Sequence, residues 1–518
     1  MREISIPELV TMVMSDQEYA ILDLRREGDF AKGHLFYATN IPRSLLELRL
    51  ETLVPRKTTC IILIELGAPK SDVKDIFDQF GYTDVRFVSG GSRAWQEAGY
   101  HLYDGINVPS KAFGEFIEET AGTPHLAPEV LHDLIQKDDS LVLIDARPFD
   151  EYQNMSIHGS VNCPGAELVY RIGSLNLRTD QKIVVNCAGR TRSIIGAQTL
   201  IDSGLKNQVF ALRDGTMGWH LAGFTLEHMK EKRLLPSAPA QLDMSREQIE
   251  KRAMRAGVRF IDAEACTEFS RDTNRTTYFF DIRDPEDFKR GHRKDFVSAP
   301  GGQLVQTFDT FAATRHARHV LCDSDGLRAP MVGAWLRQMG IDDVFCLVDL
   351  DMSSHELPSA PLADDLIRQA RLVTSSELIE LHKRGYAVYD LSSSKIYRRS
   401  HIECALFAER AQLINGSLAH DKAILVSPDG RLAQIVAREL CLAGSDVFAL
   451  EGGMQSWRQT GFPTVSGAGN LPAIPDDVFY RPYDLTDSAE DSMRAYLDWE
   501  KGLMERVSKE PGAAFRRL

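Results

Sequence analysis

Short apolar runs that end in an acidic residue recur four times along the chain. The runs ILD, VLID, YFFD and VYD end at Asp23, Asp145, Asp281 and Asp390. Apolar runs of this length, without a polar position in every second place, predict strands that are buried on both faces. In three of the four an Arg follows two positions after the Asp. A shared detail of this kind indicates an internal repeat.

Each repeat continues with a second apolar run, a short polar loop and a helical pattern that stops at Gly. These segments read CIILIELGAPKSDVKDIFDQFG, IVVNCAGRTRSIIGAQTLIDSG, HVLCDSDGLRAPMVGAWLRQMG and AILVSPDGRLAQIVARELCLAG. Gly is the usual residue just beyond a helix end. From the first Asp to the loop, the spacing is 42 positions in three repeats and 37 in the fourth: Asp23 to Glu65, Asp145 to Cys187, Asp281 to Asp323, and Asp390 to Ser427.

Buried strands that alternate with helices predict an α/β fold in which each repeat is a parallel β-sheet flanked by helices. We therefore expect four tandem domains and a C-terminal helical tail, with these boundaries: 1–105, 125–229, 242–350, 365–464, and 465–518 for the tail. The joining segments are rich in Pro, Ser and charged residues and are interpreted as linkers: 106–124, 230–241 and 351–364.

The tail is expected to contain an amphipathic helix from about Ser488. Its apolar residues recur at helical spacing: Met493, Tyr496, Leu497, Leu503, Met504 and Val507. The apolar face of such a helix must be covered. We expect it to dock on a domain of this chain, or on a second copy in a homodimer.

Charge and hydropathy narrow the class of protein. The net charge is −14, which argues against nucleic acid or an anionic membrane surface as the main partner. An N-terminus with early acidic residues does not resemble a signal peptide, and no apolar stretch is long enough to span a membrane. A cytoplasmic location is expected. An anionic substrate would then need a local positive site.

The eight cysteines are scattered, with neither a CxxC pair nor a Cys/His metal spacing. No metal site or disulfide framework is predicted, and most of these residues are interpreted as small buried side chains. Cys187 is the exception because it opens a charged loop between a strand and a helix. Arg190 and Arg192 place two positive charges in that loop, and Gly189 permits a curved backbone with inward N–H groups. With the dipole of a helix that begins near Ser193, these features favour a nucleophilic thiolate.

A family resemblance rests on these residues. The strand ending in Asp-x-Arg, a Gly/His element, a Cys-led loop of six residues and a closing Gly…Trp segment resemble the rhodanese (sulfurtransferase) domain. The second repeat matches in DARPFDEY, HGSVNCP and CAGRTRS, whereas the other three match in framework only. Four such domains in tandem resemble bacterial rhodanese-related sulfurtransferases.

The resemblance implies a thiosulfate sulfurtransferase-like enzyme. Its sulfane sulfur would pass from thiosulfate or a related small anionic donor to a thiol or cyanide acceptor through a persulfide on Cys187, without a cofactor or metal. The remaining loops hold Glu65, Asp323 and Ser427 where Cys187 is expected, so the first, third and fourth domains are predicted to be inactive.

Three groups of residues form the predicted site. Cys187 is the catalytic nucleophile. Substrate binding is assigned to the loop and to one arginine in the segment GAELVYRIG that precedes it: Ala188, Gly189, Arg190, Thr191, Arg192 and Arg171. Supporting roles are assigned to Asp145, Arg147 and His158, for which a purely structural role in the framework is the competing interpretation.

Two other functions remain open at this point. A phosphatase or arsenate reductase can share the same scaffold, but its Cys-to-Arg loop has seven residues, and six residues favour sulfur chemistry. A non-catalytic redox or scaffold protein is the second alternative, in which Cys187 would only report the redox state.

Overall fold

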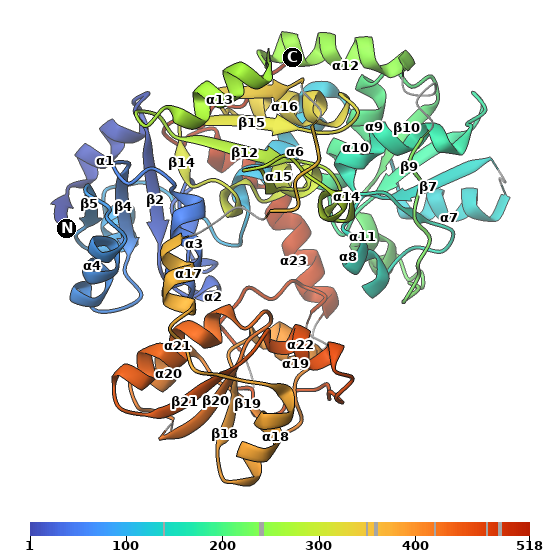
Figure 1. Cartoon of the computed structure of the whole chain (residues 1–518). Coiled ribbons are helices and arrows are strands. Elements are labelled where there is room, and N and C mark those ends of the chain that lie inside the picture. The colour runs from blue at the N-terminus through green and yellow to red at the C-terminus, as the bar shows by residue number, and fades with distance from the viewer. Residues whose placement is uncertain are drawn as a thin grey trace.

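The computed structural model describes residues 1–137, 140–237, 243–348, 351–356, 361–418, 421–472, 475–484 and 489–518. Four mainly parallel sheets, each flanked by helices, follow one another along the chain (Figure 1). The fold class is therefore α/β, as predicted. We call the four sheets with their helices the first, second, third and fourth units, and the segment from 465 onward the tail.

The first unit begins with a short edge strand and contains a sheet in the order β1-β5-β4-β2, with β3 beside β2. Its strands are β1 (Arg2–Ile4), β2 (Tyr19–Asp23), β3 (Thr39–Asn40), β4 (Cys60–Glu65) and β5 (Val85–Val88). Its helices are α1 (Ile6–Val13), α2 (Glu27–Phe30), η1 (Arg43–Leu45), α3 (Leu46–Leu53), α4 (Lys70–Gln79) and α5 (Gly91–Glu97).

The second unit has the sheet order β6-β10-β9-β7-β8, with all pairs parallel. Its strands are β6 (His125–Leu126), β7 (Leu141–Asp145), β8 (Val161–Asn162), β9 (Lys182–Asn186) and β10 (Gln208–Leu212). Its helices are α7 (Pro128–Lys137), α8 (Phe149–Asn154), η2 (Gly165–Glu167), α9 (Leu168–Arg171), η3 (Ile172–Leu175), α10 (Thr191–Asp202) and α11 (Gly215–Leu221).

The third unit repeats this order as β11-β16-β15-β12-β13. Its strands are β11 (Arg259–Ile261), β12 (Thr277–Asp281), β13 (Val297–Ser298), β15 (Arg318–Cys322) and β16 (Asp343–Leu347). Its helices are α12 (Asp243–Ala256), α13 (Ala263–Arg271), α14 (Pro285–Arg290), α15 (Gly301–Gln306), η5 (Phe308–Thr310) and α16 (Arg328–Gln338). A further strand, β14 (Thr314–Arg315), leaves this unit and pairs antiparallel with β2 of the first sheet.

The fourth unit has the order β17-β21-β20-β18-β19. Its strands are β17 (Leu372–Val373), β18 (Ala387–Asp390), β19 (Ala405–Phe407), β20 (Lys422–Val426) and β21 (Asp446–Leu450). Its helices are α17 (Pro361–Ile367), α18 (Ser375–Lys383), α19 (Ser394–Arg399), α20 (Arg410–Ile414), α21 (Arg431–Leu442) and α22 (Gly453–Gln459).

The segment 106–124, interpreted from the sequence as a linker, contains the helix α6 (Val108–Ala121). Val108, Ala112, Phe113 and Ile117 of this helix are buried, and their spacing is that of one helical face. In the sequence, the Pro and Ser near its start favoured the interpretation of this segment as a loop. That interpretation was wrong, because the apolar face of α6 packs on α10 and on the tail.

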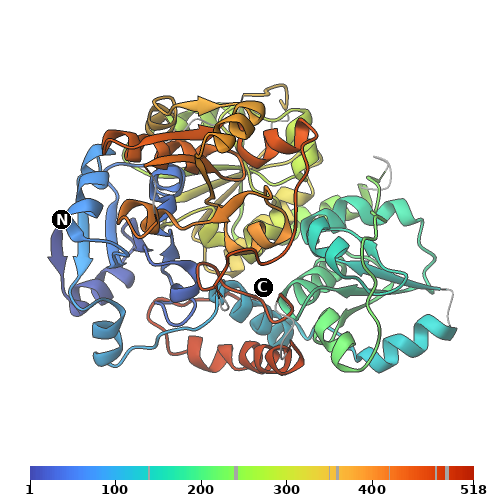
Figure 2. The same cartoon turned by 90° about the horizontal axis from the view of Figure 1, so that it is seen from below.

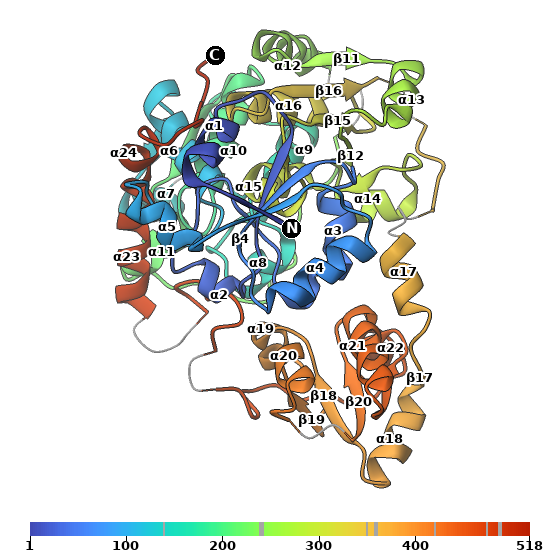
Figure 3. The same cartoon turned by 90° about the vertical axis from the view of Figure 1, so that its left-hand side faces the viewer.

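The tail forms the helices α23 (Ala489–Lys501) and α24 (Leu503–Val507), as its apolar spacing predicted. Figures 1 and 2 show α23 between the first and second units, and Figure 3 shows both tail helices alongside α6 and α11. Met493 and Leu497 pack on Met217 of α11, while Leu503 and Val507 join the apolar cluster around α6. The tail therefore docks within the chain.

The largest apolar core is shared between two units. It contains Ile144 and Val185 of the second sheet together with Phe280 and Leu321 of the third. Because buried apolar area is the main stabilising contribution in folding, these two units are expected to depend on each other. Among the described residues, no helix is both long and apolar enough to cross a membrane.

Candidate active site

Cys187 lies immediately beyond the carboxyl end of a central strand. In the second sheet Asp145 of β7 stands opposite Asn186, the last residue of β9. The loop that follows connects β9 to α10, at the edge where parallel sheets place their ligands. Cys187 is 2% exposed. Its thiol donates to the hydroxyl of Ser193 at 3.6 Å, and that hydroxyl donates to the carbonyl oxygen of Arg190 at 2.6 Å.

The loop is held against α6. A side chain at Gly114 of α6 would place its Cβ 2.9 Å from the Cα of Thr191, so only glycine allows this approach. On the other side, the N–H groups of Thr216 and Met217 in α11 donate to the carbonyls of Cys187 and Ala188 at 2.8 and 3.0 Å. These contacts leave the loop little freedom.

Arg192, the last residue of the loop, forms an ion pair with a carboxylate. Its guanidinium makes two hydrogen bonds to Glu151 of α8, at 2.8 and 3.2 Å. Arg481 of the tail contacts the same carboxylate at 3.0 Å. Burial would raise the pKa of Glu151, but Arg192 and Arg481 outweigh burial and hold that pKa well below its ordinary value. Two guanidinium groups thus share one carboxylate, and a net positive charge remains.

Arg190 differs from this arrangement. Its guanidinium contacts three carboxylates, those of Glu115 at 2.7 Å, Glu118, and Asp214 at 3.2 Å. Arg190 does line the pocket. However, its positive charge is more than balanced by its partners, so it adds little to the attraction of an anion. The sequence predicted that Arg190 and Arg192 contribute equal positive charge to the loop, but only Arg192 adds to the positive charge of the site.

A cavity of about 70 Å³ opens over Cys187, and it is built from four separate parts of the chain. The second unit supplies the loop from Cys187 to Arg192. The third unit supplies Gln303 and Gln306 of α15, α6 supplies Lys111, and the tail closes the remaining side. The tail residues that line it are Phe479, Arg481, Pro482, Tyr483, Tyr496 and Glu500.

Lys111 and Glu500 form a buried ion pair at the wall of this cavity. The Lys111 ammonium lies 3.1 Å from Oε1 of Glu500 and also contacts the Tyr496 hydroxyl. The other oxygen of Glu500 has no hydrogen-bond partner and lies 2.9 Å from where a Cβ on Gly189 would stand. A side chain at position 189 would therefore require the Glu500 carboxylate to shift.

Asp145 and Arg147 form a buried pair below the loop. The Arg147 guanidinium donates to Asp145 at 2.6 Å and to the carbonyl of Met155 at 2.5 Å. The same arrangement recurs as Asp281 with Arg283 in the third unit. His158 has an exposed side chain and contacts Glu227 at 2.9 Å. These residues do not line the Cys187 cavity, so the structure does not place them at the thiol.

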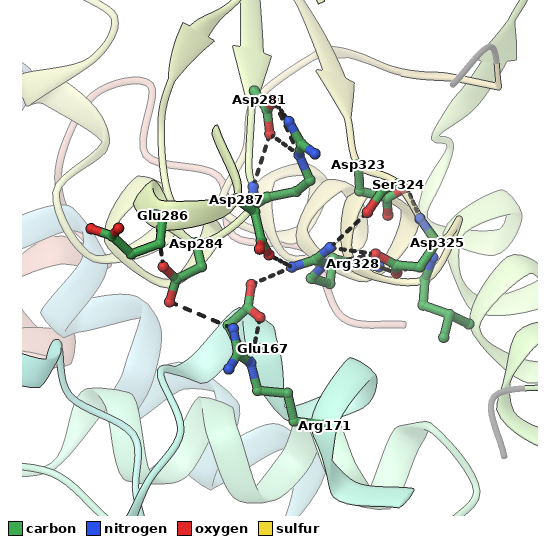
Figure 4. A network of polar contacts seen from close by, with 12 residues as sticks. Glu167, Arg171, Asp281, Asp284, Glu286, Asp287, Asp323, Ser324, Asp325 and Arg328 are labelled. Atoms are coloured by element: carbon green, nitrogen blue, oxygen red, sulfur yellow. Dashed lines mark hydrogen bonds and ion pairs between the residues drawn. The ribbon is translucent and has the colours of Figure 1, made fainter. Parts of the chain in front are cut away.

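Arg171 lies away from the Cys187 cavity, in the contact between the second and third units (Figure 4). It donates to Glu167 at 2.7 Å and to the carbonyl of Leu234 at 3.0 Å, and Asp284 lies 3.6 Å away. The predicted donor-binding residue is thus not brought together with Cys187. The segment GAELVYRIG, which was expected to cover the cleft, instead packs at the contact with the third unit.

The corresponding loops of the third and fourth units fill the place of the thiol. The carboxylate of Asp323 accepts hydrogen bonds from the N–H groups of Asp325, Gly326 and Ala329, at 3.2, 2.7 and 2.7 Å. The hydroxyl of Ser427 accepts from the N–H of Ala433 at 3.2 Å.

The first unit departs from the predicted alignment by one residue. Glu65 pairs with Asp23, as Asn186 pairs with Asp145, because the ladder shifts at a bulge between Leu22 and Asp23. Equal spacing from the Asp therefore does not give an equal place in the sheet. Assigning Glu65 to the position of Cys187 was wrong, and Leu66 is the residue that follows the strand there.

Metal binding and a second reactive thiol are the other kinds of chemistry that the described residues could offer. No group of three or more His, Cys, Asp or Glu side chains is arranged to hold a metal ion in this part of the chain. Cys322 and Cys346 are buried, and burial raises the pKa of each thiol well above its ordinary value. Such thiols are poor nucleophiles.

Sequence reasoning missed the contributions of α6, α15 and the tail. Lys111, Gln303, Arg481 and Glu500 are separated from Cys187 by 76 to 313 positions, so no local pattern could connect them. The apolar spacing of α23 was the one available signal, since a helix that must be covered can also cover a site.

Comparisons with known proteins agree with this architecture. The Rhodanese-like domain model matches residues 6–98 and 127–222. The crystal structure of thiosulfate sulfurtransferase from Pseudomonas aeruginosa is 37% identical, covers 100% of both chains and superposes with a TM-score of 0.90.

Two curated proteins are similar over shorter stretches. The putative sulfur carrier protein YrkF of Bacillus subtilis is 28% identical over 134 residues, which are 24% of this chain and 71% of that protein. The HTH-type transcriptional regulator Rv0324 of Mycobacterium tuberculosis is 34% identical over 87 residues, 17% of this chain and 38% of that protein.

Proposed function

The chain belongs to the rhodanese family of sulfurtransferases, and we propose that it transfers a sulfane sulfur atom through a persulfide on Cys187. The donor is thiosulfate or a related small anion, and the acceptor is a thiol or cyanide. The position of Cys187 at the floor of the cavity supports this assignment. The volume of about 70 Å³ favours a small donor.

The loop of the third unit carries the proposal, because it holds an anion. Three backbone N–H groups donate to the Asp323 carboxylate. At the constant offset of 136 positions between the two units, the equivalent groups around Cys187 belong to Gly189, Arg190 and Ser193. The Ser193 N–H donates to the carbonyl of Arg190 at 3.1 Å, so the N–H groups of Gly189 and Arg190 are the ones suited to the negative terminal sulfur of a persulfide, which would extend from Cys187 much as the carboxylate extends from Asp323.

The proposed reaction has two half-reactions. The Cys187 thiolate attacks the outer sulfur of thiosulfate, the S–S bond of the donor breaks, and sulfite leaves with the electron pair. An acceptor thiolate then attacks the terminal sulfur of the persulfide. The persulfide S–S bond breaks, and Cys187 leaves as a thiolate again. Covalent transfer of this kind gives ping-pong kinetics.

Intact-mass measurement after incubation with thiosulfate tests the proposal. We expect the wild-type protein to gain one sulfur atom and Cys187→Ser to gain none. Cys60→Ser is the matched control and should still gain one, because burial raises the pKa of Cys60 to about 12 and leaves it a protonated thiol. If wild type gained no sulfur from thiosulfate, mercaptopyruvate or glutathione persulfide, the proposal would be wrong. Hydrolysis of an aryl phosphate would instead favour the phosphatase alternative.

A further inference from the structure

The second and third units face each other through equivalent elements. η2 of the second unit packs against α15 of the third, and these elements correspond at the offset of 136 positions. A Cβ on Gly301 would lie 2.7 Å from the Cβ of Ala166, and one on Gly302 would lie 3.3 Å from the N of Gly165. Small residues on both sides therefore let two backbones touch.

Because the contact is made by equivalent elements, each unit sends a side chain to the loop of the other. Glu167, at the end of η2, contacts Arg328 of the third unit at 2.6 Å (Figure 4). Gln303, its counterpart at the offset of 136, lines the Cys187 cavity together with Arg192, the counterpart of Arg328. The two positions are equivalent, but the residue beside Arg328 is a carboxylate (Glu167) and the residue that lines the cavity with Arg192 is an amide (Gln303).

The charges around the two arginines differ accordingly. Arg328 is fully buried and surrounded by the carboxylates of Glu167 at 2.6 Å, Asp325 at 2.7 Å and Asp287 at 3.7 Å. These three carboxylates, one from the second unit and two from the third, more than balance the charge of Arg328.

Of the three positions that hold acidic residues around Arg328, two hold neutral residues around Arg192. Glu151 corresponds to Asp287, but Gly189 stands where Asp325 would be and Gln303 where Glu167 would be. Arg481 of the tail adds a further positive charge to Glu151. The cavity over Cys187 therefore keeps a positive charge that the third unit has lost.

We propose that Gln303 of the third unit determines the charge selectivity of the Cys187 site. Its amide closes the cavity without cancelling the charge of Arg192, and this leaves the site attractive to an anion. The role in sulfur-donor selection rests on the proposed function, but the electrostatic role does not. The third unit thus contributes a specificity-determining residue to the second, although its own loop lacks a thiol.

Alkylation of Cys187 by a matched pair of reagents tests the electrostatic role directly. Iodoacetate is an anion and iodoacetamide is neutral, and the ratio of their rate constants at Cys187 reports the local potential. We expect Gln303→Glu to lower this ratio about tenfold, because the new carboxylate would meet Arg192 as Glu167 meets Arg328. Gln303→Lys should raise the ratio. Mapping of the labelled peptide assigns the reaction to Cys187.

Glu167→Gln is the matched control, since it makes the reverse exchange at the equivalent contact with Arg328 of the third unit and should leave the ratio at Cys187 unchanged. A ratio that is the same in Gln303→Glu, Gln303→Lys and wild type would overturn the proposal. Loss of persulfide formation with thiosulfate in Gln303→Glu, with formation retained in wild type, would extend it to donor selection. Absence of persulfide in wild type, with the ratio still shifted, would instead count against the proposed function alone.

Discussion

Among individual residues, the charge at Cys187 depends less on its own loop than the sequence indicates. Arg190 is balanced by three carboxylates, and Arg192 is paired with Glu151. Arg481, which is 289 positions beyond Arg192, leaves that pair with a net positive charge. Its side chain is 40% exposed, so the guanidinium can reach both Glu151 and an incoming donor.

Replacement of Arg481 tests this assignment. We expect Arg481→Ala to raise the KM for thiosulfate about tenfold, since hydrogen bonds to charged groups contribute about 1.5–3 kcal/mol. Steady-state kinetics against thiosulfate measure the effect. Arg178→Ala is the control, because Arg178 is an exposed arginine that pairs with Asp180 on the surface. An unchanged KM in Arg481→Ala would show that Arg481 does not bind the donor.

Among the elements, the tail helices act as a wall of the site and not as an appendage. α23 covers Met217 beside the loop, and α24 packs on α6, which in turn holds Thr191. Glu510, just beyond α24, is 9% exposed and accepts a hydrogen bond from the Tyr103 hydroxyl at 2.9 Å. Burial raises the pKa of Glu510 to about 7.

This raised pKa makes docking of the tail sensitive to pH. Between the ordinary value of 4.5 and about 7, the folded state keeps a proton on Glu510 that the unfolded state releases. The contribution to stability is therefore complete below about pH 4.5 and is lost as pH rises through 7, at about 1.4 kcal/mol for each unit of pKa difference. We expect Glu510→Gln, which cannot ionise, to protect α24 from hydrogen exchange better than wild type at pH 8.

The two proteins should differ little at pH 5, where Glu510 is largely protonated in the folded state. Glu505→Gln provides the control, because Glu505 is an exposed residue of α24 and its replacement should not alter the pH dependence. Equal loss of protection between pH 5 and 8 in wild type and Glu510→Gln would contradict the assignment.

In the whole molecule, the units are joined by contacts that make them interdependent. β14 of the third unit extends the first sheet, and the second and third units share one apolar core. Their contact also contains the pair of Glu167 and Arg328, whose side chains are 4% and 0% exposed. Breaking a buried pair by removing one partner leaves an uncompensated charge.

We therefore expect Glu167→Ala to lower the free energy of unfolding by about 3–5 kcal/mol. Thermal or denaturant unfolding of the full chain measures this loss. Asp180→Ala removes a partner from an exposed pair and should cost less than about 1 kcal/mol. A loss in Glu167→Ala as small as that in Asp180→Ala would show that the buried pair does not hold the two units together.

Local pattern was sufficient for the α/β class, for the recurrence of the strand–loop–helix segment and for the place of Cys187 within it. A buried strand, a helix end and a loop are specified by neighbours in the chain, so their signals lie in short windows. Short windows of sequence did not predict features that depend on strand register or on packing between elements. The bulge at Asp23 displaced Glu65 by one position. The apolar residues of α6 do recur at helical spacing in the sequence, but only the packing on α10 and the tail shows which surfaces they cover.

The sequence by itself thus determined the type of fold, the repetition and the place of Cys187, the residue that we propose as the nucleophile. Only the tertiary structure decided which charges surround that nucleophile. Gln303 and Arg481 reach the cavity because α15 packs on η2 and the tail crosses the second unit. Arg171, much closer in sequence, turns to Glu167 instead. Electrostatic attraction depends on distance in space, and distance along the chain carries no information about it across separate units.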